Sequence, residues 1–125
     1  MQLEKITTLL VVDSIEAVLP TWKKLGYSVS VRVPETGTLG FVILQGGPGE
    51  LMLQTKRSLK EDLPAVAKLK PAHLLYADVK SLARAKKVLS AARVLVAERT
   101  TFYGAKESWL ELEGGTILGL AEHAG

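Results

Sequence analysis

The sequence carries one short motif twice: Gly40–Gly47 reads GFVILQGG, and Ser108–Gly115 reads SWLELEGG. Both copies read as a strand that ends in a Gly-Gly turn. Further along the chain, Leu51–Leu53 matches Leu118–Leu120 with an offset of one residue. Self-similarity of this kind indicates an internal repeat, so we expect two copies of one supersecondary unit.

The segments around the first motif predict a strand, a helix and three strands. The predicted strands are Ile6–Val12, Tyr27–Val33, Leu39–Gln45 and Glu50–Gln54. Asp13 is expected to cap the helix that follows the first strand, with Glu16 reaching back toward the cap and Gly26 ending the helix. Pro20 lies inside this helix and predicts a kink or a late start, because proline removes a backbone donor.

The second copy repeats the same order after a charged linker at 56–70, which carries a short predicted helix. Its predicted strands are Ala72–Ala77, Arg93–Ala97, Glu107–Leu112 and Ile117–Glu122. Asp78 is expected to cap a helix over Val79–Ala91. The chain therefore reads as one α+β domain over 1–125, with module one at about 1–55 and module two at about 71–125.

Composition excludes several classes of protein. With 125 residues, 47% hydrophobic and 23% charged, the chain suits one globular domain. The absence of cysteine excludes disulfides, zinc–thiolate sites, iron–sulfur clusters and thiol catalysis. The N-terminus lacks the layout of a signal peptide and no apolar run is long enough for a bilayer, so we expect a cytoplasmic protein without membrane contact.

The positive charge does not predict a nucleic-acid partner. The formal net charge is only +3. The basic stripe Lys80, Arg84 and Lys87 has no aromatic side chains interleaved with it, so we interpret it as a solvated helix face.

Several segments together resemble the vicinal oxygen chelate superfamily, which includes glyoxalase I, extradiol dioxygenases, and fosfomycin- and bleomycin-resistance proteins. The matching segments are Val12–Ala17, Leu19–Trp22, Leu25-Gly26, Thr101–Glu107 and Gly114-Gly115. Small glyoxalase-like proteins are the most similar members. The resemblance implies two βαβββ modules that form a curved mixed sheet around a concave cleft, and a homodimer.

The resemblance also locates the positions where metal-dependent members hold a divalent ion. Here those positions carry Thr7, Met52, Pro71 and Gly119, none of which is a useful ligand, and His73 is the only imidazole on a strand. The resemblance therefore implies a metal-free protein, without cofactor, that binds or sequesters a planar or cationic small molecule. The alternatives are a metal-dependent lyase, isomerase or dioxygenase, and a scaffold that binds no ligand.

Trp109 is the main candidate for a ligand-binding residue. Strand alternation places Glu107, Trp109 and Glu111 on one face, while Leu110 and Leu112 point to the helix-covered core. An indole between two carboxylates suits a flat or cationic ligand through stacking and cation–π attraction. A large side chain that only fills the half-barrel explains the same pattern equally well.

The remaining candidates each have a functional and a structural interpretation. Phe102 and Tyr103 precede the Trp109 strand and form either a binding lid or part of a dimer seam. Phe41 is the repeat counterpart of Trp109, and it either lines the ligand pocket or only fills space in the core. Met52 is also predicted to line the pocket. His73 is a general-base candidate or a structural histidine. No catalytic residue is assigned.

Overall fold

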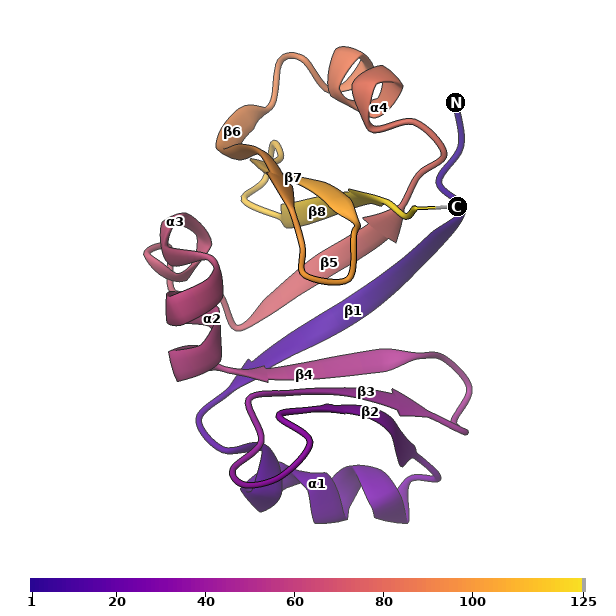
Figure 1. Ribbon diagram of the computed structural model, residues 1–125, viewed down its shortest axis with the longest axis vertical. Coiled ribbons are helices and arrows are strands. Elements are labelled where there is room, and N and C mark those ends of the chain that lie inside the picture. The colour runs from indigo at the N-terminus through magenta and orange to yellow at the C-terminus, as the bar shows by residue number, and fades with distance from the viewer. Residues whose placement is uncertain (125) are drawn as a thin grey trace. The chain divides into compact units, whose positions relative to one another are not determined.

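The computed structural model describes residues 1–124 and divides into two compact units. We call Thr7–His73 the N-terminal unit, and Leu74–Gly125 together with Met1–Ile6 the C-terminal unit. The elements are β1 (Lys5–Val12), α1 (Ile15–Lys24), β2 (Ser28–Val33), β3 (Phe41–Gln45), β4 (Leu51–Thr55), α2 (Lys56–Asp62), α3 (Pro64–Ala67), β5 (His73–Asp78), α4 (Leu82–Val88), β6 (Arg93–Thr100), β7 (Lys106–Glu111) and β8 (Ile117–Glu122) (Figure 1). The predicted α+β class and the repeated order of strand, helix and three strands are confirmed.

The N-terminal unit has the strand order β2-β3-β4-β1, with β1 and β4 parallel and the other pairs antiparallel. Helix α1 covers one face of this sheet (Figure 1). The core between them contains Ile15, Leu39, Val42, Leu44 and Leu53, each at most 8% exposed. The other face of the sheet carries Met52 and Gln54, and α1 does not cover it.

The start of α1 differs from the prediction in its cap. The helix begins at Ile15, so the residue before it is Ser14, whose Oγ accepts a hydrogen bond from Ala17 N at 3.2 Å. Asp13 instead lies 3.0 Å from Lys56 Nζ. α1 also runs through Pro20 as one continuous helix from Ile15 to Lys24.

Glu16 binds a neighbouring loop and does not bond back to the helix cap. Its carboxylate accepts a hydrogen bond from Leu39 N at 2.8 Å, and this bond lowers the pKa of Glu16. The carboxylate therefore ties the start of α1 to the segment that leads into β3.

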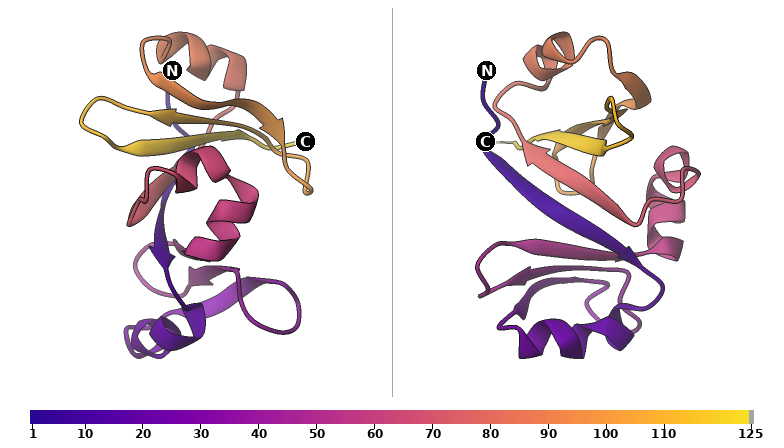
Figure 2. Two further views of the ribbon diagram at one scale, coloured as in Figure 1. Left: turned by 90° about the vertical axis from the view of Figure 1, so that its left-hand side faces the viewer. Right: turned by 180° about the vertical axis from the view of Figure 1, so that it is seen from behind.

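The C-terminal unit repeats this arrangement with the strand order β5-β8-β7-β6, in which only β5 and β8 are parallel. Figure 2 shows α4 on one side of these strands. The core contains Ala77, Val79, Leu82, Ala85, Leu110, Leu118 and Leu120. Leu110 and the partly buried Leu112 belong to this core, as strand alternation predicts.

Helix α4 is shorter than predicted and has another cap. It begins at Leu82, where Ser81 Oγ accepts from Arg84 N at 3.2 Å. Asp78 does not cap it, because β5 continues through Asp78. The predicted helix over Val79–Ala91 was therefore too long at both ends.

The linker contains two short helices where one was expected, and each buries an apolar side chain. Leu59 of α2 is 1% exposed and Val66 of α3 is 0% exposed. Thr55 caps α2 by accepting a hydrogen bond from Ser58 N at 3.0 Å. No helix within residues 1–124 is long and apolar enough to cross a membrane.

Candidate functional site

Glu107 on β7 is the one buried charged side chain among residues 1–124, with 1% of its surface exposed. Its Oε1 lies 2.9 Å from Arg99 Nε, 2.8 Å from Arg99 Nη2 and 3.0 Å from Trp109 Nε1. Its Oε2 accepts hydrogen bonds from the Tyr103 hydroxyl, at 3.2 Å, and from the Tyr76 hydroxyl. We call these five residues the Glu107 cluster. Burying a carboxylate without hydrogen-bond donors costs free energy of folding. The four surrounding side chains supply these donors.

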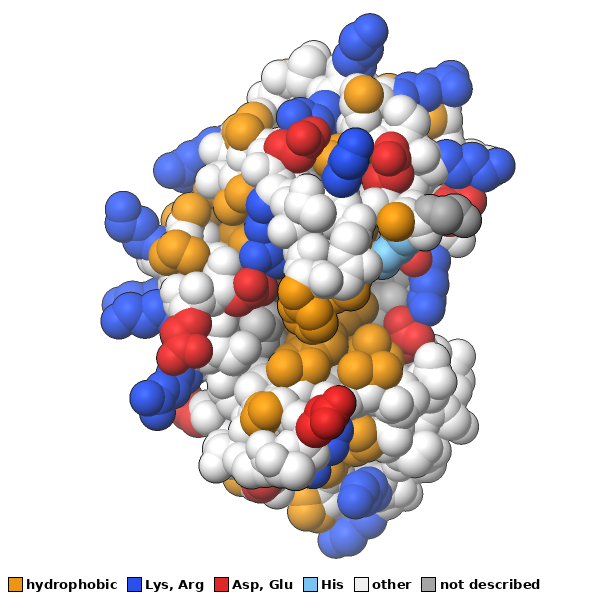
Figure 3. Space-filling view, viewed as in Figure 1, with side chains coloured by type: hydrophobic (Ala, Val, Ile, Leu, Met, Phe, Trp, Pro, Cys, Tyr) orange, Lys and Arg blue, Asp and Glu red, His pale blue; other side chains and the backbone are white. Residues whose placement is uncertain are grey.

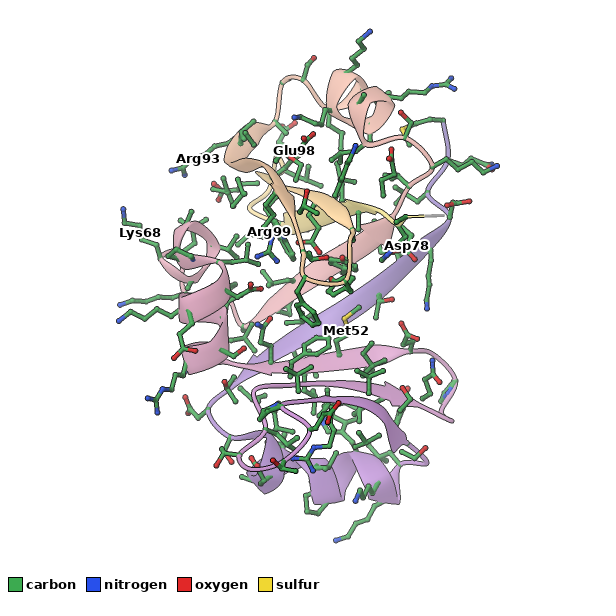
Figure 4. All side chains as sticks on the ribbon, viewed as in Figure 1. Met52, Lys68, Asp78, Arg93, Glu98 and Arg99 are labelled. Atoms are coloured by element: carbon green, nitrogen blue, oxygen red, sulfur yellow. The ribbon has the colours of Figure 1, made fainter. Side chains whose placement is uncertain are left out.

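The register of the C-terminal sheet brings the cluster together. Arg99 on β6 pairs with Glu107 on β7. On the next row, Trp109 on β7 and Tyr76 on β5 both pair with Gly119 on β8. Paired residues lie on the same face of a sheet, so these side chains share the face that α4 does not cover. Figure 4 labels Arg99 on β6.

Trp109 lies directly over Gly119. A Cβ atom added at Gly119 would be 2.6 Å from Cη2 of the indole, closer than atoms can pack. The ring of Tyr76 lies beside the indole, with 5.9 Å between ring centroids. Only 2% of Trp109 is exposed, so its indole is a packed part of this face.

The two tyrosines of the cluster are hydrogen-bond donors at neutral pH. Burial raises the pKa of Tyr76, and the negative charge of Glu107 raises it further. Burial also raises the pKa of Tyr103, although its hydrogen bond with Tyr76 acts in the opposite direction. Because both phenols stay protonated, neither can act as a general base near pH 7.

The loop between β6 and β7 presents two aromatic side chains. Phe102 is 91% exposed and Tyr103 is 54% exposed, and their rings meet edge to face with centroids 5.1 Å apart. Thr101 closes the loop, since its Oγ1 accepts a hydrogen bond from Ala105 N at 3.0 Å. Gly104 has φ 87°, a conformation that glycine adopts at little cost. The loop is thus a closed turn that holds Phe102 in solvent.

An Asp–His pair next to this loop was not anticipated. His123 Nε2 lies 2.9 Å from Asp78 Oδ1, and the His123 ring stacks on Tyr103 with centroids 6.4 Å apart. Asp78 is the last residue of β5 and His123 follows β8, and these two strands are a parallel pair, which is the sequence signal that could have found them. His73 is exposed and alternates to the face of β5 opposite Tyr76, so it takes no part in the cluster.

The other predicted site residues lie outside the Glu107 cluster. Glu111 shares the strand face of Glu107 but is paired with Arg93 at 3.0 Å. Phe41 and Met52 belong to the N-terminal sheet, where Phe41 pairs with Gln54 and Met52 is 7% exposed. Their roles in ligand binding stay predictions.

Solved structures with the same arrangement of elements identify the fold. One is a glyoxalase/bleomycin resistance protein/dioxygenase superfamily member from Vibrio splendidus 12B01, with TM-score 0.68, 16% identity, and 94% of this chain and 97% of that chain covered. The chain has the glyoxalase/bleomycin resistance protein/dioxygenase fold. A hypothetical protein from Bacillus halodurans C-125 is similar at TM-score 0.70 and 19% identity, over 99% of this chain and 95% of that one. A protein from Staphylococcus aureus matches at TM-score 0.68 and 16% identity, over 99% and 100%. By sequence, no family model and no curated protein matches the chain.

The residues at the four positions where the resemblance places the divalent ion of metal-dependent members do not suit a metal ion. Of the four corresponding positions, Gly119 has no side chain and Trp109 fills the space above it. Thr7 Oγ1 donates a hydrogen bond to Glu50 at 3.3 Å, and neither Met52 nor Pro71 offers oxygen or imidazole nitrogen from its side chain. Within residues 1–124 no three His, Asp or Glu side chains gather closely enough to hold a metal ion.

Proposed function

We propose that this protein binds a small planar molecule, reversibly and without a metal ion, at the loop that presents Phe102 and Tyr103. The observation that carries the proposal is a solvent-exposed aromatic pair whose inner member is anchored to a buried carboxylate. The Tyr103 hydroxyl donates a hydrogen bond to Glu107, and the Phe102 ring packs edge to face against the Tyr103 ring. Ordering a flexible side chain costs binding free energy, and this cost is smaller for Tyr103 because its hydroxyl is already bound to Glu107.

The charges around the loop favour a planar ligand without positive charge over a cationic ligand. Glu107 is paired with Arg99 and Glu111 with Arg93, so neither carboxylate is left to attract a cation. Asp78 is shared with His123. On the face shown in Figure 3, Lys and Arg side chains are dispersed, which offers no continuous basic surface to a nucleic-acid backbone.

A screen of planar aromatic fragments against their saturated analogues tests this function. Binding is followed by NMR shifts of the backbone amides at 101–105. Phe102→Ala is expected to weaken the best fragment about tenfold, as for other aromatic anchors. Val94→Ala is the matched control, because Val94 is 54% exposed on β6 of the same unit. The proposal fails if saturated analogues bind equally well, or if the two variants behave alike.

We also propose that the chain forms a homodimer. Strands β2 and β6 are edges of their sheets, and β2 exposes 44% of Val31 and 38% of Val33. Exposed apolar edges favour pairing with a symmetric partner. Sedimentation at micromolar concentration is expected to give twice the chain mass of 13.5 kDa. A monomer under these conditions would refute the proposal without affecting fragment binding at Phe102.

A further inference from the structure

A surface groove of about 890 Å³ in the N-terminal unit lies against α2, α3 and the residues that follow them. Its apolar lining consists of Val11, Leu59, Pro64, Ala65, Ala67 and Pro71. Its charged lining consists of Lys56, Lys60, Lys68 and Lys70, and no Asp or Glu lines it. We call these ten residues the lysine groove. It shares no residue with the Glu107 cluster.

Helical spacing explains why lysines and an apolar floor meet there. Lys56, Leu59 and Lys60 are at positions i, i+3 and i+4 of α2, so they share one face of the helix. Leu59 is 1% exposed and anchors that face, while the acidic residues Glu61 and Asp62 do not line the groove. The lysine stems can therefore extend the apolar floor while their ammonium groups stay in water.

The end of α3 adds the other two lysines. Lys68 is the C-terminal cap of α3, and Figure 4 shows its side chain extending away from the helices. Lys70 has φ 52°, the one positive φ of a non-glycine residue within 1–124. A left-handed conformation costs a lysine some free energy.

The groove keeps most of its positive charge unneutralised. Lys56 is paired with Asp13 at 3.0 Å. Within residues 1–124, Lys60, Lys68 and Lys70 form no ion pair with a carboxylate. Like charges held around a concave apolar surface raise the local concentration of anions.

We propose that the lysine groove binds an amphipathic anion, a small molecule with an apolar chain or ring system and one carboxylate or phosphate group. The apolar part lies on the Leu59 floor, and the anionic group is bound by the lysines at the rim. The volume suits a small molecule, since such sites commonly enclose about 300–1,000 Å³. No aromatic side chain lines the groove to stack on bases, which argues against a single-stranded nucleic acid.

Binding of dodecanoate below its micelle concentration, measured by titration calorimetry, tests the proposal. Dodecyl phosphate is expected to bind as well, whereas dodecyltrimethylammonium, with the same chain and the opposite charge, is not. Shortening the chain to hexanoate is expected to weaken binding by up to about fourfold for each methylene that is fully buried. Equal binding of the cationic detergent would overturn the role of the lysines.

A charge-reversal pair locates the site. Lys60→Glu with Lys68→Glu is expected to weaken dodecanoate binding at least about tenfold, because both ion-pairing partners are lost. Lys23→Glu with Lys24→Glu is the matched control, since it makes the same change in charge on α1 of the same unit and is expected to change binding less than about twofold.

Two further results would also overturn the proposal. One is an unchanged affinity in the lysine-groove pair. The other is binding to anionic lipid vesicles with none to monomeric dodecanoate, which would assign the surface to a membrane. Neither result touches the fragment screen at Phe102, so the two proposals stand or fall separately.

Discussion

The two units are built from the same motif, yet the sheet faces that α1 and α4 do not cover differ. In the N-terminal unit, Phe41 pairs with Gln54 and Met52 pairs with Ile43. In the C-terminal unit, Trp109 takes the place of Phe41 but pairs with Gly119, the counterpart of Met52. The second hairpin is therefore shifted by two residues relative to the first. Because side chains alternate with a period of two, this shift keeps the paired strand residues on their faces and changes only their neighbours.

The two faces also differ in polarity: the C-terminal face contains the Glu107 cluster, whereas the N-terminal face contains no buried charged side chain within residues 1–124. The face of the N-terminal sheet that points away from α1 carries Met52 and the neutral Gln54. Gln54 Nε2 donates a hydrogen bond to Ser58 Oγ at 3.0 Å. On the C-terminal sheet, Gly119 makes room for the Trp109 indole, which in turn donates to the buried Glu107. The buried carboxylate has no counterpart in the first repeat, where Leu39 stands at the position of Glu107 and packs in the core with Ile15.

Truncating the two aromatic counterparts gives the largest expected contrast. Trp109→Ala is expected to lower the free energy of unfolding by about 3–5 kcal/mol, because it opens a cavity at a nearly fully buried site. Phe41→Ala, at a partly exposed site, is expected to cost clearly less. Urea denaturation of both variants measures the difference. If Trp109→Ala keeps the parental stability but abolishes binding of a planar fragment, Trp109 is a ligand wall and not a packed residue.

Removing the charge of Glu107 is expected to cost about 3 kcal/mol of stability, because Glu107→Gln breaks the ion pair with Arg99 at a side chain that is only 1% exposed. Glu111→Gln is the matched control. It breaks the more exposed pair with Arg93 and is expected to cost less than about 1 kcal/mol. Equal effects in thermal or urea unfolding would show that burial does not distinguish the two carboxylates.

Gly119→Ala is expected to cost about 1–3 kcal/mol, since the new methyl group displaces the Trp109 indole. Gly49→Ala in the other unit serves as the control, because a Cβ atom there meets nothing within 4 Å and φ is not positive. Its expected effect lies within about 0.5 kcal/mol. A shift of the tryptophan emission spectrum in Gly119→Ala alone would confirm the site of the clash, and unchanged emission and stability would contradict it.

High pH is expected to weaken the C-terminal unit through its tyrosines. The pKa of Tyr76 and of Tyr103 is raised in the folded protein, so the stability they contribute is complete below their unfolded pKa near 10 and is lost as the pH rises above it. Stability should fall by up to about 1.4 kcal/mol per pH unit for each tyrosine that remains protonated only in the folded state.

Stability curves between pH 9 and 11 measure this effect. Tyr76→Phe is expected to reduce the slope. An identical slope in the parent and in Tyr76→Phe would show that this phenol does not differ between the folded and unfolded states.

Local patterns were enough to predict most of the fold. Strand periodicity correctly assigned Leu110 and Leu112 to the core and Glu107 and Trp109 to the opposite face. The helix caps were less predictable. Asp13 and Ser14 are both suitable N-cap residues, and which of them caps α1 depends on where the first helical turn begins. The same holds for Asp78, which lies in β5 because this strand begins and ends one residue later than predicted.

The partners of Glu107 could not be read from the sequence in the same way. Trp109 lies two residues away on the same strand, but Tyr76 is separated from Glu107 by 31 positions and reaches it only because β5, β8 and β7 are neighbours. Likewise, the sequence marked His73 as the strand imidazole, whereas His123 is the one that meets Asp78 and Tyr103.

The sequence by itself determined the repeat, the order of the elements and the face on which each strand residue lies, because these follow from local alternation and helical spacing. Only the tertiary structure decided which side chains meet on a given face. That choice depends on strand order and on register, and a shift of two residues changes every cross-strand pair without changing the pattern of hydrophobic residues. For this reason Glu107 could be placed on its face from the sequence, but its five hydrogen-bonding and ionic contacts could not.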